Sequence, residues 1–337
     1  MVPAIAVADA LRAEGAEVSF VGGQRAEAEL VPAAGYPLDT IKVEGIDRRN
    51  PLKAARAVGR AAVALKTARA ILRDRGADAV LGGGGYVAGP VGAAAVARRI
   101  PLVLTEADSH LGLTNRLLAG RAKRVCLAFP IEGRTGERYL VTGRPVPART
   151  STREDARAAL GLEAEDRCLL VFGGSLGARS VNHAAVAAFA DAPYRVLHVA
   201  GRRDFPDLQA PGPHYDLRDY LSPFGQALAA ADLAVARAGG SIFELAQYGV
   251  PAVLVPYPHA TADHQTANAR WMEQGGAAVV LADATLTPEA LRAAVDAILL
   301  DPARLEAMAT AAMRLARPDA AACVAGEVLR AARSSIR

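Results

Sequence analysis

The stretch ARAGGSIFELAQYGVPAVLVPYPHATADHQTANA, residues 236–269, decides how this chain is expected to fold. It follows the apolar segment 232–236 and runs through a glycine pair into a helical pattern that opens at Ser241. The order of strand, loop and helix is then repeated. Short apolar runs separated by helical periodicity predict parallel strands with right-handed helical crossovers. We therefore expect two helix amino termini to follow two neighbouring strand ends.

Glycines and polar residues gather at these strand ends. Gly239 and Gly240 permit close approach of a ligand, and helix amino termini attract phosphate. Glu244, in the first helical turn, can only accept hydrogen bonds, which suits sugar hydroxyls. Its alternative role is as a favourable partner of the helix dipole, worth roughly 0.3–1 kcal/mol. The block predicts a pocket for a sugar nucleotide. Its other polar candidates are Arg237, Ser241, His264, Gln265 and Asn268.

The same alternation runs through the whole chain and predicts an α/β protein with two doubly wound parallel-sheet domains facing each other across a cleft. The break is expected in the Pro-rich segment GRPVPART, which gives domains 1–145 and 146–316. A last helix, within 317–337, is expected to pack back on the first domain. Further strands are expected at 17–21, 79–81, 102–105, 125–128, 139–142, 168–172, 195–200, 252–255 and 278–281, and helices at 2–14, 51–75, 153–160, 262–274, 288–299 and 302–315.

Composition narrows the function classes. Three cysteines without metal-ligand spacing argue for a reducing compartment and against a disulfide framework. With no apolar run near the roughly 18 residues of a spanning helix and no signal peptide, we expect a soluble protein that at most touches a membrane. The basic segment 53–75 is either a solvated helix face or a surface for anionic lipid. Nucleic acid is disfavoured because no aromatic stacking platform accompanies it.

Six motifs together resemble the MurG family of peptidoglycan glycosyltransferases. They are VPAIAVADAL (2–11), GGGGYVAGP (82–90), TEADSHLGLTNRLLA (105–119), VTGRPV (141–146), GGSLGARSVN (173–182) and the 237–268 block. The resemblance implies a GT-B fold on the cytoplasmic face of the cell membrane, bound peripherally. It also implies an inverting transfer of N-acetylglucosamine from UDP to lipid I, giving lipid II for cell wall synthesis, with no metal and no cofactor.

The resemblance also implies roles for individual residues. Glu244 would accept both ribose hydroxyls, the Leu221 backbone and Phe224 would face the uracil, and Gln265 and Asn268 would bind the transferred sugar. Asp108 and His264 would complete the donor site, beside Arg237. The diphosphate would lie against Gly174, Ser175, Gly177, Gly239, Gly240 and Ser241. The acceptor diphosphate would lie against Gly82, Gly83, Gly84, Gly85 and Tyr86, with Tyr86 and Glu106 as catalytic candidates.

The chain departs from the family pattern at several positions. The glycine-rich loop ending in His that usually precedes residues 1–3 is absent, so a first strand is expected to be lacking. Asp108 stands where the family has Asn, His264 where it has Gln, and Pro147 where an Arg is common, with Arg149 as a substitute. The donor site is therefore better supported than the catalytic base, for which Glu106 is favoured over Asp108.

Rival interpretations remain open from the sequence. They are another GT-B enzyme, such as a glycolipid glycosyltransferase or a UDP-N-acetylglucosamine 2-epimerase, and a chain that binds UDP-sugar without catalysis. A dinucleotide turn at 173–178 is disfavoured because Ser175 breaks the G-x-G-x-x-G pattern. A metal site at His259, Asp263 and His264 is disfavoured because the three lie in a loop.

Overall fold

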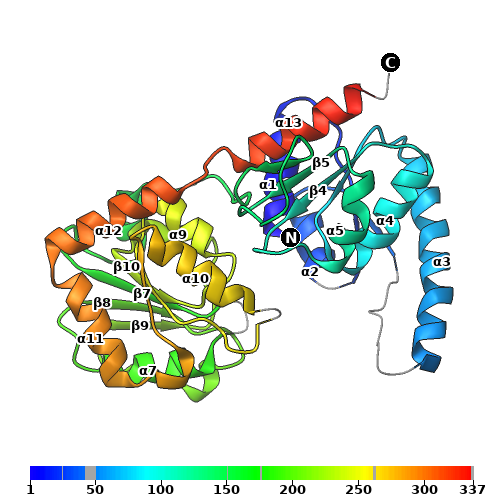
Figure 1. Ribbon diagram of the computed structural model, residues 1–337. Coiled ribbons are helices and arrows are strands. Elements are labelled where there is room, and N and C mark those ends of the chain that lie inside the picture. The colour runs from blue at the N-terminus through cyan, green and yellow to red at the C-terminus, as the bar shows by residue number, and fades with distance from the viewer. Residues whose placement is uncertain (25, 42–50, 150, 175–176, 261–262, 335–337) are drawn as a thin grey trace. The chain divides into compact units, whose positions relative to one another are not determined.

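A computed structural model describes residues 1–24, 26–41, 51–149, 151–174, 177–260 and 263–334, without the side chains of residues 26 and 51–61 (Figure 1). The chain forms two compact units, Met1–Pro147 with Arg317–Arg337, and Ala148–Ala316. Every strand pair is parallel. Each unit layers helices on parallel strands, which confirms the predicted α/β class.

The strands of the first unit form two sheets. β1 (Phe20–Gly22) pairs with β2 (Leu38–Thr40), and a four-stranded sheet has the order β3-β4-β5-β6. Among the described residues no strand joins β1 to β3. The four strands are β3 (Val80–Gly82), β4 (Leu102–Glu106), β5 (Arg124–Leu127) and β6 (Tyr139–Val141). The helices are α1 (Val2–Ala13), α2 (Ala26–Ala33), α3 (Pro51–Asp74), α4 (Gly85–Ala97), α5 (Leu113–Leu118), η1 (Ala119–Arg121) and α13 (Ala320–Arg333).

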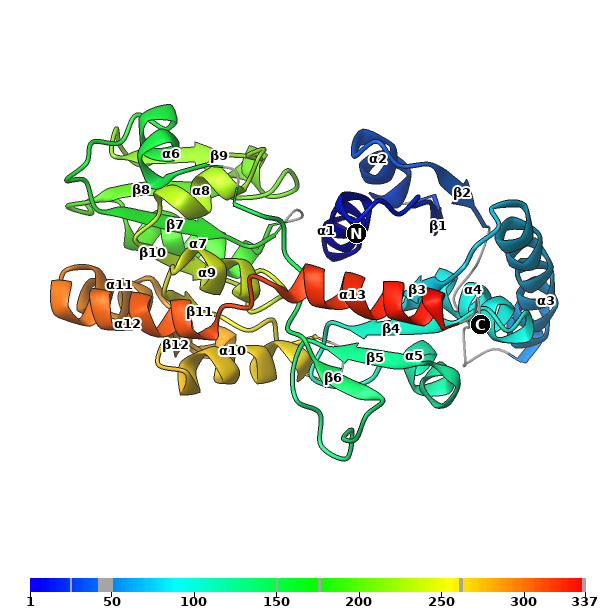
Figure 2. The same ribbon diagram turned by 90° about the horizontal axis from the view of Figure 1, so that it is seen from above.

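Strand β4 is the centre of the first unit because it is buried on both faces. Leu102 and Leu104 pack toward α3 and α4, whereas Val103 packs toward α1 and α13. Helix α13 contacts both α1 and β4, as Figure 2 shows. A buried carboxylate, Glu327 on α13, pairs with Arg124 on β5 at 3.0 Å. The last helix is thus part of the first unit's core.

The second unit has one six-stranded sheet, in the order β12-β11-β10-β7-β8-β9. Because β7 is the first strand of this unit, the chain winds outward through β8 and β9 and then returns to the other side of β7 at β10. The strands are β7 (Cys168–Phe172), β8 (Arg195–Val199), β9 (Tyr215–Arg218), β10 (Leu233–Ala236), β11 (Ala252–Leu254) and β12 (Ala278–Val280). The helices are α6 (Arg153–Ala159), α7 (Arg179–Ala188), η2 (Phe205–Asp207), α8 (Gly225–Ala230), α9 (Ile242–Tyr248), α10 (His264–Gln274), η4 (Asp283–Thr285), α11 (Pro288–Leu299) and α12 (Pro302–Leu315).

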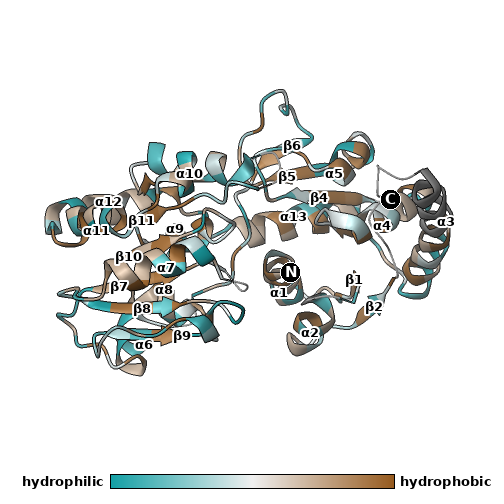
Figure 3. Ribbon diagram, turned by 90° about the horizontal axis from the view of Figure 1, so that it is seen from below, coloured by the Kyte–Doolittle hydropathy of each residue, from teal (hydrophilic) through white to brown (hydrophobic). Residues whose placement is uncertain are grey.

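Helices cover both faces of this sheet. Leu169 and Val171 on β7 belong to a buried cluster with apolar residues of α7 and α11. All five residues of β7 are buried, and Figure 3 shows the strands of both units as predominantly apolar. A strand buried on both faces reads as a continuous apolar run, which is why its bounds could be predicted from the sequence.

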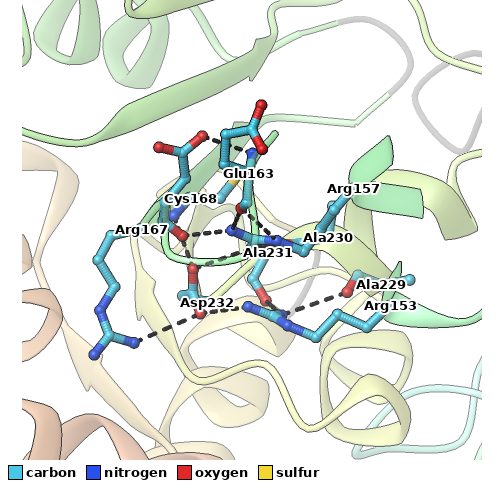
Figure 4. A network of polar contacts seen from close by, with 10 residues as sticks. Arg153, Arg157, Glu163, Arg167, Cys168, Ala229, Ala230, Ala231 and Asp232 are labelled. Carbon is cyan, nitrogen blue, oxygen red and sulfur yellow. Dashed lines mark hydrogen bonds and ion pairs between the residues drawn. The ribbon is translucent and has the colours of Figure 1, made fainter. Parts of the chain in front are cut away.

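An ion-pair network fastens α6 to the amino ends of β7 and β10 (Figure 4). Arg157 is buried and donates to the carbonyl oxygens of Glu163 and Ala230. Asp232 Oδ2 accepts from the Cys168 amide at 2.8 Å and lies 3.6 Å from Arg157 Nη1. Asp232 Oδ1 pairs with Arg153 at 2.6 Å. The network lies at the opposite end of the strands from the candidate site.

We expect Asp232→Ala to destabilise the second unit by about 3–5 kcal/mol, because it leaves the buried Arg157 without a counter-charge. Urea unfolding followed by circular dichroism measures the change. In the control, Asp191→Ala, the lost carboxylate is 92% exposed, so the change should stay within about 0.5 kcal/mol. Equal shifts in the two variants would contradict a special role of the network.

Candidate functional site at the switch point of the second sheet

The second sheet reverses its winding between β7 and β10, and ligands of doubly wound sheets bind outside the carboxyl ends of the strands at such a point. Phe172 at the end of β7 lies opposite Ala236 of β10, which in turn lies opposite Leu254 of β11. The segments that follow, 173–178, 237–241 and 255–263, therefore begin at one edge. They contain Ser175, Arg237, Gly239, Gly240 and Ser241 of the residues predicted to bind the donor, and Glu244, His264, Gln265 and Asn268 follow in the next helices.

The loop after β7 folds back tightly because of its glycines. A β-carbon on Gly173 would lie 2.4 Å from the backbone nitrogen of Ala178, and one on Gly177 would lie 2.2 Å from the carbonyl oxygen of Ala200. Among the described residues, no atom lies within 4 Å of the β-carbon position on Gly174, whose φ is +92°. Gly173 and Gly177 thus serve internal packing, and Gly174 faces open space. Ser175 lies outside the described residues.

A buried hydrogen-bonded chain supports this loop from behind. The Asn182 amide donates to Ala200 at 2.9 Å and to the Asp204 carboxylate at 3.1 Å, which leaves its oxygen to accept from His198 Nε2 at 3.0 Å. His198 Nδ1 then accepts from the Tyr215 hydroxyl at 2.7 Å. Because the Asn182 oxygen can only accept, Nε2 carries a proton, and burial keeps the ring neutral, which leaves Nδ1 as the acceptor. Burial lowers the pKa of His198 to about 3.

Arg237 connects four segments of the site. Its Nη1 donates to the carbonyl oxygens of Val255 and Pro256, both at 3.1 Å, and lies 2.6 Å from Asp283 Oδ1. Its Nη2 donates to Ser180 Oγ at 2.8 Å, and that hydroxyl donates to Asp283 at 2.7 Å. The guanidinium thus ties the end of β10 to β11, α7 and η4. These contacts favour a positioning role, and direct contact with a nucleotide stays a prediction.

The predicted residues of α10 lie against the glycine turn after β10. Asn268 is buried and donates to the carbonyl oxygen of Ala238 at 3.0 Å. Gln265 accepts from the Tyr257 amide at 3.0 Å, and its Nε2 lies 4.0 Å from a β-carbon position on Gly239. His264 is the first residue of α10. The structure thus places Gln265 and Asn268 against the turn that holds Gly239, with His264 preceding them at the start of α10, and the contacts of all three with a sugar remain predicted.

The residues predicted to hold the nucleoside lie on two segments of this unit. Glu244, the third residue of α9, has a partly exposed side chain, and Ser241 is the N-cap of that helix. Phe224 caps α8 and packs edge-on against Phe172, with ring centroids 5.0 Å apart. Leu221, three residues earlier in the sequence, is also buried. The contact with Phe172 brings the 221–224 segment to the start of the glycine loop.

In the first unit, the four-glycine segment leads from β3 into α4. A β-carbon on Gly82 would lie 2.8 Å from Leu104, whereas Gly84 and Gly85 have positive φ angles of +77° and +79°. Gly83 has Thr105 Oγ1 as its nearest neighbour at 3.7 Å. The Tyr86 ring, one residue into the helix, is 62% exposed. The turn is therefore open at its helical end, where the acceptor was predicted.

Glu106 is buried beside this turn, and both carboxylate oxygens are engaged. Oε1 accepts from the Ala107 and Asp108 amides at 3.0 and 3.3 Å, and Oε2 accepts from the Gly112 amide at 2.8 Å and the Asn115 amide group at 2.9 Å. All four of these donors belong to the segment 107–115, so the carboxylate fixes the path of the chain after β4. The geometry favours a role in shaping the 107–112 loop, and a catalytic role stays a prediction.

The described residues include neither a ready metal-ligand cluster nor a membrane-spanning helix. No group of three or more His, Cys, Asp and Glu side chains converges there as a metal site. No described helix is both long enough and apolar enough to cross a membrane. His259 instead packs its ring edge against Tyr257, with centroids 5.5 Å apart.

Comparisons with known proteins identify the chain. It matches the glycosyltransferase family 28 N-terminal domain over residues 1–127 and the C-terminal domain over residues 168–324. It is 41% identical to the UDP-N-acetylglucosamine--N-acetylmuramyl-(pentapeptide) pyrophosphoryl-undecaprenol N-acetylglucosamine transferase of Methylococcus capsulatus, covering 96% of this chain and 93% of the relative. The enzyme of the same name from Salinibacter ruber is also 41% identical, with 97% and 92% covered.

Solved structures agree. The crystal structure of Acinetobacter baumannii MurG superposes with a TM-score of 0.77 at 32% identity, covering 97% of this chain and 95% of that one. A UDP-GlcNAc 2-epimerase from Neisseria meningitidis has a TM-score of 0.69 at 12% identity, covering 98% of each chain, and shares the fold alone. Two doubly wound units of this kind define the GT-B class of glycosyltransferases. Within that class, the chain belongs to glycosyltransferase family 28 and, in it, to the MurG family.

We expect Arg237→Lys and Asp283→Asn each to weaken UDP binding roughly tenfold, because each breaks hydrogen bonds to charged groups that hold the site together. Isothermal titration calorimetry measures the affinity. If Arg237 instead bound the diphosphate directly, Asp283→Asn would release its charge and tighten UDP binding. Weaker binding in Arg237→Lys with tighter binding in Asp283→Asn would therefore contradict the positioning role.

His198 should make the stability of the second unit depend on pH. Because its pKa is lowered from 6.5 to about 3, the unfolded chain takes up a proton between these values and the folded chain does not. Stability should fall as pH drops below 6.5, by up to about 1.4 kcal/mol per pH unit. His198→Gln should lose this slope in urea unfolding between pH 7 and pH 4, whereas His183→Gln, at an exposed position, should keep it. Parallel curves for wild type and His198→Gln would refute the assignment.

Proposed function

We propose that the chain transfers N-acetylglucosamine from UDP to the muramoyl 4-hydroxyl of undecaprenyl-diphosphate-linked N-acetylmuramoyl-pentapeptide, giving lipid II for peptidoglycan synthesis. The names of near full-length relatives at 41% identity support this reaction. The observation that carries the donor site is the glycine-lined switch point between β7 and β10, with Glu244 in the helix that follows. Such a point is the usual site of a nucleotide in a doubly wound sheet.

Donor binding is assigned to the second unit, 146–316 in the predicted division. Gly174, Gly239 and Gly240 would line the diphosphate, where open backbone leaves room for phosphate oxygens. Glu244 would accept from the ribose hydroxyls, and Phe224 would line the uracil pocket with the Leu221 backbone. The transferred sugar would meet the start of α10. The remaining proposed donor ligands are Asp108, Ser175, Ser241, His264, Gln265 and Asn268, and Arg237 would position the segments around them.

The proposed chemistry is a single displacement with inversion. The acceptor oxygen bonds to the anomeric carbon as the bond to UDP breaks, and the electron pair passes to the leaving diphosphate. Backbone N–H groups near Gly174 and Gly240 stabilise that charge, so the reaction is proposed to need no cofactor. The hydroxyl proton requires an acceptor in hydrogen-bond reach. Glu106, which is buried, and Asp108, which is partly exposed, are the candidate acceptors, and Tyr86 would lie near the lipid-linked acceptor.

The acceptor and membrane are assigned to the first unit. The segment Gly82, Gly83, Gly84, Gly85 and Tyr86 would receive the lipid-linked diphosphate. The basic helix α3 would meet the anionic inner leaflet at the cytoplasmic face, with no role for nucleic acid. Lys66, Arg69 and Arg73 are exposed on that helix. Lys53, Arg56 and Arg60 belong to the same predicted surface, and their side chains lie outside the described residues.

The reaction is tested with purified chain, UDP-GlcNAc and a water-soluble lipid I analogue. We expect UDP release that requires the acceptor, a disaccharide product, and a clear preference over UDP-glucose. Formation of UDP-ManNAc without acceptor would instead identify an epimerase, and use of UDP-glucose with a diacylglycerol acceptor would identify a glycolipid transferase. Binding of UDP with none of these products would leave a non-catalytic UDP-sugar-binding chain.

We expect Glu244→Ala to weaken UDP binding at least roughly tenfold, because the ribose hydroxyls lose a charged acceptor. The sharper measurement compares UDP with 2′-deoxy-UDP by calorimetry. Wild type should prefer UDP, and Glu244→Ala should lose that preference. Glu289→Ala, which removes an exposed carboxylate from the first turn of α11, is the matched control. A retained preference in Glu244→Ala would remove the ribose assignment.

A further inference from the structure

The carboxyl edge of the second sheet is rich in cations. Four arginines follow the ends of strands β7, β8 and β10, namely Arg179, Arg202, Arg203 and Arg237. Two of them are neutralised by neighbouring acids. Arg237 lies 2.6 Å from Asp283, and Arg203 donates to both carboxylate oxygens of Asp204, at 2.7 and 3.0 Å. Each of these two charges therefore has its counter-charge within the protein.

The other two arginines have no acidic partner. The guanidinium of Arg202 lies over the Tyr220 ring, 4.8 Å from its centroid. Arg179 is the first residue of α7 and is exposed. Among the described residues, its guanidinium forms no hydrogen bond, ion pair or ring contact. Arg179 is thus the cation of this edge whose side chain is still available to a ligand.

Asp204 does not neutralise Arg179. The pKa of this carboxyl is lowered chiefly by the hydrogen bond from Arg203, and the charge of Arg179 lowers it further. Both oxygens are already engaged, however, because Arg203 donates to each and the Asn182 amide donates to Oδ2. One turn further along α7 the chain has Asn182 and His183, and neither is acidic. The positive charge is therefore left without a local counter-ion.

The place of Arg179 in its helix adds an independent observation. The amino end of an α-helix has a positive partial charge and exposed N–H groups, so a cation there is electrostatically unfavourable. The N-cap is Ala178, which offers no side-chain oxygen, and the first turn has no acidic residue. An anion at this end would accept from the backbone and pair with the guanidinium, which removes both costs.

The glycine loop brings this cation to the place proposed for the diphosphate. The Gly177 amide donates to the carbonyl oxygen of Gly174 at 2.9 Å, and this bond closes the loop. Arg179 follows Gly177 by two residues, and Gly174 is exposed. The long side chain of Arg179 therefore starts beside the accessible backbone of the loop.

We propose that Arg179 binds the diphosphate of the sugar nucleotide and stabilises the charge that it gains as the bond to the sugar breaks. This role rests on the proposed function, which assigns UDP to the switch point. A guanidinium matches two phosphate oxygens in bidentate geometry. Arg237, which is paired with Asp283, keeps its separate role in holding the segments of the site together.

The test compares two variants of the full chain that each lose one positive charge. Arg179→Gln removes the proposed ligand, and the control Arg270→Gln removes an exposed cation from α10. Calorimetry measures the affinity for UDP, and competition against UDP measures the affinity for uridine, which has no phosphate. We expect Arg179→Gln to bind UDP roughly tenfold more weakly and uridine as wild type does, with both affinities unchanged in Arg270→Gln.

Three results would overturn the role of Arg179. One is an equal loss of UDP affinity in the two variants, and another is an equal loss of UDP and uridine affinity in Arg179→Gln. The third is a raised KM for the lipid-linked acceptor with unchanged UDP affinity, which would assign the cation to the acceptor diphosphate. A wild type that does not prefer UDP over uridine would contradict the proposed function itself, and with it this inference.

Arg179→Glu separates ligand binding from folding. A carboxylate suits the first turn of a helix, so this variant should have a higher melting temperature than wild type. It should also bind UDP more weakly than Arg179→Gln does, because the carboxylate repels phosphate. A lower melting temperature in both Arg179 variants would indicate a structural role and overturn the proposal.

Discussion

The donor side of this protein depends on a backbone contact that only glycine permits. Gly177 approaches the carbonyl oxygen of Ala200 so closely that a β-carbon would lie 2.2 Å from it. This contact turns the loop after β7 back onto the end of β8 and sets the start of α7 behind the switch point. The position of Gly174, which faces open space, follows from it. The glycines of this loop thus have two separate roles: Gly177 permits internal packing, and Gly174 leaves the backbone accessible to a ligand.

Buried polar groups around that loop are used for rigidity more than for contact with a substrate. Arg237 joins four segments through its guanidinium, and Asn268 holds the carbonyl oxygen of Ala238. The chain from Tyr215 through His198 and Asn182 ends on Asp204, whose pKa is lowered chiefly by the hydrogen bond from Arg203. A site with prepositioned dipoles needs little rearrangement when charge develops on a leaving diphosphate. In the first unit, Glu106 is likewise a buried polar group whose hydrogen bonds hold a loop, the segment 107–112.

The sequence predicted the elements whose apolar runs are long and buried. The bounds of β7, α11 and α12 agree with the prediction because each has a strong period or a clear cap. Strands β2 and β9 were not predicted, because their sequences, LDT and YDLR, are short and contain polar residues. They are strands because the fold pairs them with β1 and β8. The positioning role of Arg237 could not be predicted from the sequence either, because its partner Asp283 lies 46 positions further along the chain. Asn115, which donates to Glu106, lies in the motif 105–119, but nothing in the sequence predicted this contact.

The central claim is that UDP binds at the switch point of the second unit. Hydrogen–deuterium exchange with and without UDP tests it most directly, because backbone amides that contact phosphate or become buried exchange more slowly. The account predicts slower exchange in peptides covering 173–178, 221–224, 237–244 and 264–268, with no change in 82–86. Protection confined to 82–86, or no protection anywhere at saturating UDP, would contradict it.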